Sequence, residues 1–200
     1  MFSDIFVITG FGLMAPILAI FIKENLVGGT IFAAGFSSAL YLIIKSLVQL
    51  PFSRYVDSHK DKIKWMVLGT ILISIVPIIY ILANHIYSIY LAQIIYGIGS
   101  GLAYPTWLGL WSTNLDKKHE SFEWSLYSTL TGAGTALAAV VGATIAQFLG
   151  FTFTFIFVGV MSFTGAMILI GLNNADKKKL KPIPINNYHK RSKLSPKNSH

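Results

Sequence analysis

One lysine lies inside a long apolar stretch of the chain, where a charged side chain is costly. Lys45 falls within the stretch 30–52, about two helical turns before its end, with Tyr41 one turn before it and Gln49 one turn after it. Residues four apart lie on the same face of a helix, so these three side chains form a polar stripe, which Ser38 extends. We expect the stripe to line a cavity inside a helix bundle. The alternative is that the Lys45 side chain reaches along the helix to a polar interface.

A carboxylate and a second row of side chains could complete a site around Lys45. Asp4 is the one carboxylate expected at membrane depth, and a pair with Lys45 would lower the cost of burying both charges. We expect this pair to be structural or to act as a gate, with proton coupling as the alternative. Side chains in the stretch 86–111 that could line a cavity for an organic solute are Gln93, Tyr96, Tyr104 and Trp107. The alternative for the aromatic residues is packing against lipid or anchoring at the membrane interface.

The residues of the chain do not form a set that favours catalysis. Gly99-Ser100-Gly101 is similar to the G-x-S-G sequence of intramembrane serine proteases, but a serine nucleophile needs a base within hydrogen-bond reach. All five histidines fall in expected loops or in the C-terminal tail: His59, His85, His119, His189 and His200. The sequence contains no H-E-x-x-H motif, no P-loop or Rossmann glycine pattern and no cysteine. It therefore predicts neither an enzyme nor a bound metal or cofactor.

Six apolar stretches dominate the chain, and each has close to the ~20 residues that an α-helix needs to cross a bilayer. They cover residues 5–22, 30–52, 65–83, 86–111, 125–149 and 151–172. Only 12% of the residues are charged, whereas soluble domains carry about 25%. The alternating pattern of a membrane β-barrel is absent. The sequence predicts an all-α membrane protein, with one six-helix domain over residues 1–172 and a basic, disordered tail over residues 173–200.

The basic residues gather after the second stretch, after the fourth stretch and in the tail. Of the 16 Lys and Arg residues, all but Lys23 and Lys45 fall in these three segments. Because positively charged loops stay in the cytoplasm, we expect both termini there, in a multi-pass protein of the cell's inner (plasma) membrane. An even number of spans also requires both termini on one side. The net charge of +8 then reflects topology and contact with anionic lipid, and nucleic acid is not an expected partner.

A motif of two glycines and a proline occurs twice in the chain, with the same spacing between its residues. The motif reads G-x-G-L-x-x-P at Gly10, Gly12 and Pro16, and again 89 residues later at Gly99, Gly101 and Pro105. Each copy opens a group of three stretches, so the two groups would cross the membrane in opposite directions. Inverted repeats are a feature of transporters, which bind solutes near the bilayer midplane between the repeats. The alternative is chance, because Gly and Pro are frequent in membrane helices. Gly97 and Gly101 also form a small-x-x-x-small ridge that favours helix packing.

The segment after the second stretch carries a recognisable pattern. Its polar residues are Ser53, Arg54, Asp57, Lys60, Lys62 and Lys64. The segment resembles the G-x-L-a-D-R-x-G-R-R loop between helices 2 and 3 of the major facilitator superfamily, with Asp57 at the Asp. Ser53 and Lys60 stand at the two glycines, and Ser58 replaces the usual Arg. The resemblance implies a conformational role, in which charge pairs between helices break when access alternates. The alternative is that these charges only set the topology.

The fourth stretch extends this resemblance. Gln93, Gly97, Gly99 and Gly101 match the family's R-x-x-x-G-x-G-x-G sequence, except that Gln93 replaces the Arg, so a buried-cation role is not carried over. The resemblance spans residues 1–172. The family usually has twelve helices in two halves, whereas this chain has six. It is identified as a half-length member that resembles the N-terminal half.

Together these features predict secondary-active transport of a small solute by alternating access. Six helices enclose only half of the cavity that the resemblance implies, so we expect a homodimer or a pairing with another six-helix chain. The lipid bilayer is the other expected partner. The alternative function is a non-transporting membrane protein, either a truncated relative of a transporter or a module that regulates another protein. The degraded loop motif and Gln93 favour this alternative, and the polar stripe around Lys45 opposes it.

Overall fold

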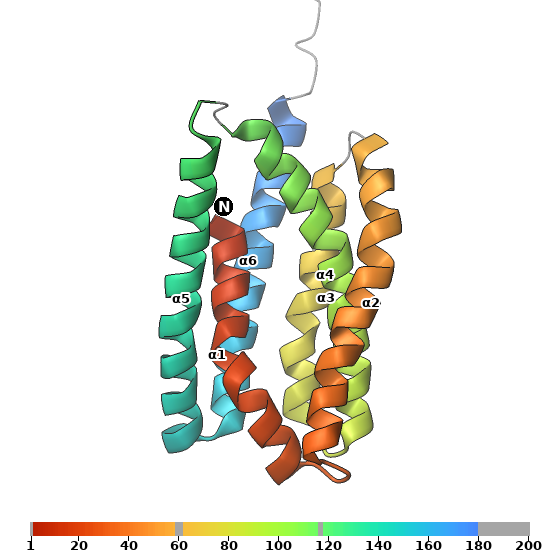
Figure 1. Cartoon of the computed structure of the whole chain (residues 1–200), viewed down its shortest axis with the longest axis vertical. Helices are drawn as coiled ribbons and strands as arrows, with labels where there is room; N and C mark the ends of the chain where they lie inside the picture. The colour runs from red at the N-terminus through yellow and green to blue at the C-terminus, as the bar shows by residue number, and fades with distance from the viewer. Residues whose placement is uncertain (1, 59–61, 116–117, 180–200) are drawn as a thin grey trace, which may run out of the picture.

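Six long helices make up almost all of the described chain (Figure 1). The structure, a computed structural model, describes residues 2–58, 62–115 and 118–179, without the side chains of residues 2–7, 62, 114 and 172–179. The helices are α1 (Phe2–Asn25), α2 (Ile31–Ser58), α3 (Lys62–Leu82), α4 (Ile86–Asn114), α5 (Glu120–Leu149) and α6 (Phe151–Lys179). Each contains a stretch long and apolar enough to cross a membrane. The predicted all-α, six-helix fold is confirmed.

All six helices are longer than the predicted spans, and α2 and α6 extend furthest past a predicted end. α2 continues past Pro51 to Ser58, where the expected span ended near Phe52. Proline removes one backbone hydrogen bond, but Phe52 and Tyr55 pack on Trp65 of α3, at 5.2 and 5.8 Å, and stabilise the additional turns. α6 continues to Lys179 and so includes the first residues of the segment expected to be a tail. Residues 180–200 of that segment lie outside the described chain.

Lys45 lies midway along α2, and at ~1.5 Å per residue each end of the helix is roughly 20 Å away. The next charged residue of the helix is Arg54, nine residues or roughly 14 Å from Lys45. The position along the helix alone therefore fits both predictions for Lys45, the cavity and the interface.

The helices pack as two groups of three. α1 packs against α5 and α6, and α4 packs against α2 and α3, while contacts between α3 and α6 join the two groups. Figure 1 shows α1 and α4 crossing the bundle in opposite directions. Exchanging α1 with α4, α2 with α5 and α3 with α6 converts the contacts of one group into those of the other. This is the arrangement expected of two inverted three-helix repeats.

The repeated glycines make equivalent contacts in the two groups. A Cβ atom added to Gly10 would lie 3.3 Å from the Met161 Cβ and 3.6 Å from the Val158 carbonyl oxygen of α6. A Cβ atom added to Gly99 would lie 3.1 Å from the Leu72 Cβ and 2.8 Å from the Gly69 carbonyl oxygen of α3. Val158 and Met161 follow Gly69 and Leu72 by the same 89 residues that separate Gly10 from Gly99. The repeat therefore extends to α3 and α6, whose sequences show no such motif.

Burial follows the same symmetry. Within the spans, 44% of α1 and 44% of α4 are buried, against 17% of α2 and 11% of α5. α1 and α4 therefore form the centre of the bundle, and α2 and α5 form its flanks. The least covered helices are the two that the repeat relates to each other.

The two ends of the bundle differ. We call the end where α2 joins α3 and α4 joins α5 the basic end, and the other the short-loop end. At the short-loop end the α1–α2 and α3–α4 connections are joined by hydrogen bonds from the Val27 amide to the Asn84 carbonyl (3.1 Å) and from the Ile86 amide to the Val27 carbonyl (3.1 Å). Gly28 has a φ of +80°, which favours glycine. A Cβ at Gly29 would overlap the Ile22 carbonyl, so only glycine fits this turn.

Candidate functional site

Glycines on α4 bring its backbone against the polar stripe of α2. A Cβ atom added to Gly97 would lie 3.0 Å from the Tyr41 carbonyl oxygen, and one added to Gly101 would lie 3.1 Å from the Lys45 carbonyl oxygen. Helices pack this closely only where a side chain is missing. The two glycines thus set the register in which α4 side chains meet Tyr41 and Lys45.

The Lys45 ammonium lies over two tyrosine rings. Its Nζ atom is 4.7 Å from the ring centroid of Tyr104 and 5.9 Å from that of Tyr41. Both distances fall within the ~6 Å range of cation–π attraction. Tyr104 is 43% exposed and Lys45 is half-buried, so the group is accessible from outside the bundle. We call Lys45, Tyr41 and Tyr104 the Lys45 seam.

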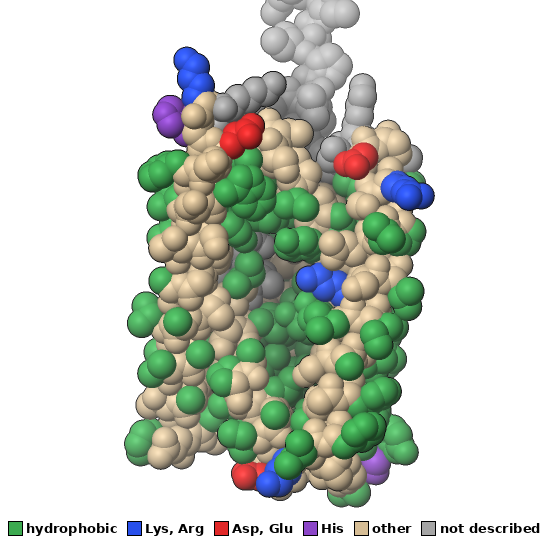
Figure 2. All heavy atoms as spheres, viewed as in Figure 1, with side chains coloured by type: hydrophobic (Ala, Val, Ile, Leu, Met, Phe, Trp, Pro, Cys, Tyr) green, Lys and Arg blue, Asp and Glu red, His purple; other side chains and the backbone are tan. Residues whose placement is uncertain are grey.

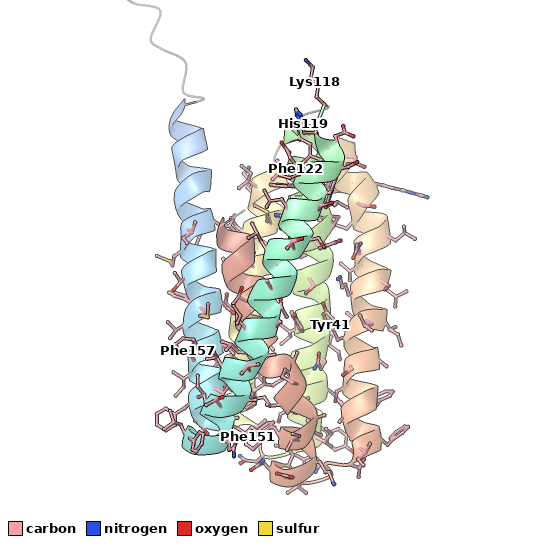
Figure 3. The ribbon with its side chains drawn as sticks, turned by 60° about the vertical axis from the view of Figure 1, so that its left-hand side comes forward. Tyr41, Lys118, His119, Phe122, Phe151 and Phe157 are labelled. Atoms are coloured by element: carbon pink, nitrogen blue, oxygen red, sulfur yellow. The ribbon has the colours of Figure 1, made fainter. Side chains whose placement is uncertain are left out.

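The seam lies on a hollowed face of the molecule. Figure 2 shows a hollow between the α1 and α5 side of the bundle and α2, with mainly hydrophobic side chains around it and a basic group within it. Figure 3 shows Tyr41 between α2 and α4. A position midway along α2, on the open side between the two helix groups, is where inverted-repeat transporters bind solutes.

Three stacked rings connect the seam to α1. Tyr96 stacks on Tyr41 with a centroid distance of 4.3 Å and an interplanar angle of 17°, and on Phe11 with 4.4 Å and 14°. The stack therefore spans α2, α4 and α1, which belong to both repeats. Phe11 was not among the predicted site residues. No local pattern distinguishes Phe11 from the other apolar residues of its stretch.

A second aromatic cluster joins α4 to α5 nearer the basic end. Trp107 stacks with Trp111 at 5.9 Å and lies 4.8 Å from Tyr127, while Trp124 lies 6.3 Å from Trp111. Trp107 is buried and also contacts Tyr104 of the seam, at 6.2 Å. The sequence did not indicate Tyr127, although its spacing from Trp124 places both on one face of a helix.

The other predicted cavity residues lie around this centre. Gln93 is buried on α4, at 3% exposure, one turn toward the short-loop end from Gly97. Gln49 is half-buried on α2, one turn from Lys45 toward the basic end, and Ser38 is exposed and donates a hydrogen bond to the Ala34 carbonyl at 3.4 Å. Asp4 lies in α1 among the residues whose side chains are not described, so its predicted pair with Lys45 stays a prediction.

Five of the six residues of the predicted loop motif belong to helices, three to the end of α2 and two to the start of α3. Ser53, Arg54 and Asp57 lie in the last turns of α2, and the Ser53 hydroxyl donates to the Leu50 carbonyl at 2.8 Å. Packing of Phe52 on Trp65, at 5.2 Å, ties these turns to the start of α3. Lys64 is exposed near the start of α3. Lys60 and the side chain of Lys62 lie outside the described part.

Pro16 and Pro105 lie inside α1 and α4, which continue past them. Within the described residues, no three His, Asp or Glu side chains come together as a metal site would require.

A comparison with known protein families agrees with the six-helix membrane fold. The family model described as Major Facilitator Superfamily matches residues 1–196 of the 200-residue chain. No curated protein matches the sequence. The match covers all six helices, so the twelve-helix pattern of two halves is represented here by one half.

Proposed function

Because the chain belongs to the major facilitator superfamily, we propose that this multi-pass membrane protein carries a small solute across the bilayer by secondary-active, alternating access. The observation that carries the proposal is the Lys45 seam. An accessible cation lies midway along a membrane helix, at the face between two inverted three-helix groups. Such a residue is costly in lipid, and transporters place polar groups there to bind solutes.

We further propose that two six-helix units meet at the hollowed face. α2 and α5 flank this face and are the least covered helices of the bundle. A second copy would cover them and close the hollow into a cavity. A different six-helix chain could fill the same place, and co-purification from the native membrane would reveal it.

The proposed orientation has both termini in the cytoplasm. The basic end carries Arg54, Lys64 and Lys118, whereas the described connections of the short-loop end carry no Lys or Arg beyond Lys23 at the end of α1. Figure 3 shows Lys118 and His119 at the start of α5, at the opposite end of the bundle from Phe151. The positive-inside rule places the basic end in the cytoplasm. We propose the plasma membrane of the cell as the membrane that holds the protein.

The proposal is tested by purification in mild detergent, a thermal-shift screen of small solutes, and flux into liposomes. We expect a dimer, at least one solute that raises the melting temperature, and uptake of that solute above the rate of protein-free liposomes. A folded protein that stays monomeric at all concentrations and binds no solute would contradict the proposal and favour a non-transporting role.

A further inference from the structure

We propose that the solute bound at the Lys45 seam is a small organic monoanion with an apolar body. Its negative group would lie on the Lys45 ammonium, and its body against the tyrosine rings. The inference rests on the transport function proposed above and narrows the class of substrate. Four features of the described residues carry it.

The first feature is the set of partners that Lys45 has. Within the described part of the chain, its ammonium contacts only the faces of Tyr104 and Tyr41. An ammonium has three N–H donors, and ring faces satisfy them only weakly. The site therefore offers hydrogen-bond donors to a ligand that brings acceptors.

The second feature is the placement of the carboxylates. Among the described side chains, acidic residues occur near helix ends: Glu24 in α1, Asp57 in α2, and Glu120 and Glu123 in α5. None is at the depth of Lys45. The positive charge at the middle of α2 is thus not neutralised by a described acidic side chain, and a ligand anion would supply the missing charge.

The third feature is the accessibility of the charge. Lys45 lies midway along α2, and its ammonium lies over the exposed ring of Tyr104. A solute that enters the hollow can therefore reach the ammonium. A cationic solute would be repelled, and a neutral one would leave the lysine charge uncompensated.

The fourth feature is the surface beside the charge. Tyr104 is 43% exposed, and its ring leads to Trp107 at a centroid distance of 6.2 Å. Hydrophobic side chains surround the hollow in Figure 2. One cation beside an apolar, aromatic wall fits one negative charge on an apolar body, as in an aromatic carboxylate, better than an inorganic anion or a polyanion.

The test measures binding to the purified full-length protein in mild detergent by calorimetry, with three probes. Benzoate carries the charge and the ring, benzamide has the same shape without the charge, and acetate lacks the ring. We expect saturable binding of benzoate, with benzamide and acetate each at least tenfold weaker. Equal binding of benzoate and benzamide, or no saturable binding of benzoate, would overturn the inference.

Four variants locate the site. Lys45→Met should abolish the preference for benzoate over benzamide, whereas Lys45→Arg, which keeps the charge, should retain it. Lys23→Met removes a lysine from the end of α1 and should change nothing. Asp4→Asn removes the carboxylate that the sequence predicts to pair with Lys45. The inference requires Lys45 to be uncompensated instead of paired with Asp4, so benzoate affinity should stay the same in this variant. A preference that survives Lys45→Met, or a tenfold gain of affinity in Asp4→Asn, would overturn the inference.

A flux measurement separates this inference from the proposed function. Labelled benzoate is offered to liposomes that contain the protein. Binding that depends on Lys45 without uptake would support the anion site and contradict transport of this anion. Uptake of a neutral or cationic solute by a protein that does not bind benzoate would support transport and overturn the anion site.

Discussion

At the scale of single residues, the stacked rings and Lys45 depend on one another. Placing a lysine at the centre of a membrane helix costs about 2.5–3.5 kcal/mol, and cation–π contacts at accessible sites contribute on the order of 0.5–1 kcal/mol each. The two rings at 4.7 and 5.9 Å therefore offset part of that cost. Tyr41 belongs both to this pair and to the stack with Tyr96 and Phe11, so the stack holds one of the rings beneath the ammonium.

Removal of the central ring tests this dependence. Tyr96→Leu eliminates two stacked pairs, each worth about 0.5–1.5 kcal/mol beyond the burial of its area, so we expect a loss of ~1–3 kcal/mol in the free energy of unfolding. Tyr96→Phe keeps both stacks and should retain most of the stability. Thermal unfolding in detergent measures both variants. Equal melting temperatures for the two would show that the stack does not support the helix bundle.

The sequence predicts the members of the seam better than their arrangement. Helical spacing is enough to place Tyr41, Lys45 and Gln49 on one face, because that relation is local. Tyr104 and Tyr96 were indicated by their residue types. Their contacts with α2 could not be predicted, because they require α4 to pack against α2, which is not its neighbour in sequence. Phe11 resembles any other apolar residue until the three helices are placed together.

At the scale of helices, glycine contacts decide which pairs pack. α5 meets α1 at Gly142, where an added Cβ atom would overlap the Leu13 backbone, whereas a Cβ atom at Gly132 of the same helix would meet nothing within 4 Å. Gly142 is buried and Gly132 is exposed. One glycine thus permits close packing of two helices, and the other does not take part in it.

This contrast provides a matched pair of variants. Gly142→Ala should force α1 and α5 apart and cost about 1–3 kcal/mol of stability, as overpacking of a core does. Gly132→Ala changes the same residue type in the same helix and should be neutral or slightly stabilising, because alanine has a higher helix propensity than glycine. The midpoint of thermal unfolding distinguishes them. A similar loss in both variants would attribute the effect to α5 itself and not to its contact with α1.

Helix ends show where prediction from sequence stops. The six spans can be predicted from the length of the apolar stretches, since a helix satisfies its backbone hydrogen bonds internally in lipid. The end of α2 cannot be predicted in this way, because Pro51 and the polar residues after it are typical of a helix end in water. The packing of Phe52 and Tyr55 on Trp65 of α3, at 5.2 and 5.8 Å, stabilises the additional turns. That contact is tertiary, and local propensity gives no sign of it.

At the scale of the whole molecule, the inverted repeat organises the contacts. The 89-residue offset relates Gly10 to Gly99 and also relates their partners on α6 and α3, although α3 and α6 share no visible motif. Backbone packing thus preserves a relation that the side chains have lost. Alternating access in inverted-repeat transporters uses this relation, because each repeat can adopt the conformation of the other.

The orientation is tested by single cysteines, since the chain has none of its own. We expect Asn84→Cys, at the short-loop end, to react in intact cells with a thiol reagent that cannot cross membranes. Lys118→Cys, at the basic end, should react only after the cells are opened. Reaction of both positions in intact cells, or the reverse order, would contradict cytoplasmic termini.

The most direct test of the account is whether the Lys45 position faces water inside the membrane. Lys45→Cys should react with a water-soluble, charged thiol reagent added from either side of reconstituted membranes. Leu47→Cys is the control, because Leu47 is 67% exposed on nearly the opposite side of α2 and should face lipid. The account predicts fast labelling at position 45 and none at position 47. Labelling at position 45 that is no faster than at position 47 would contradict it.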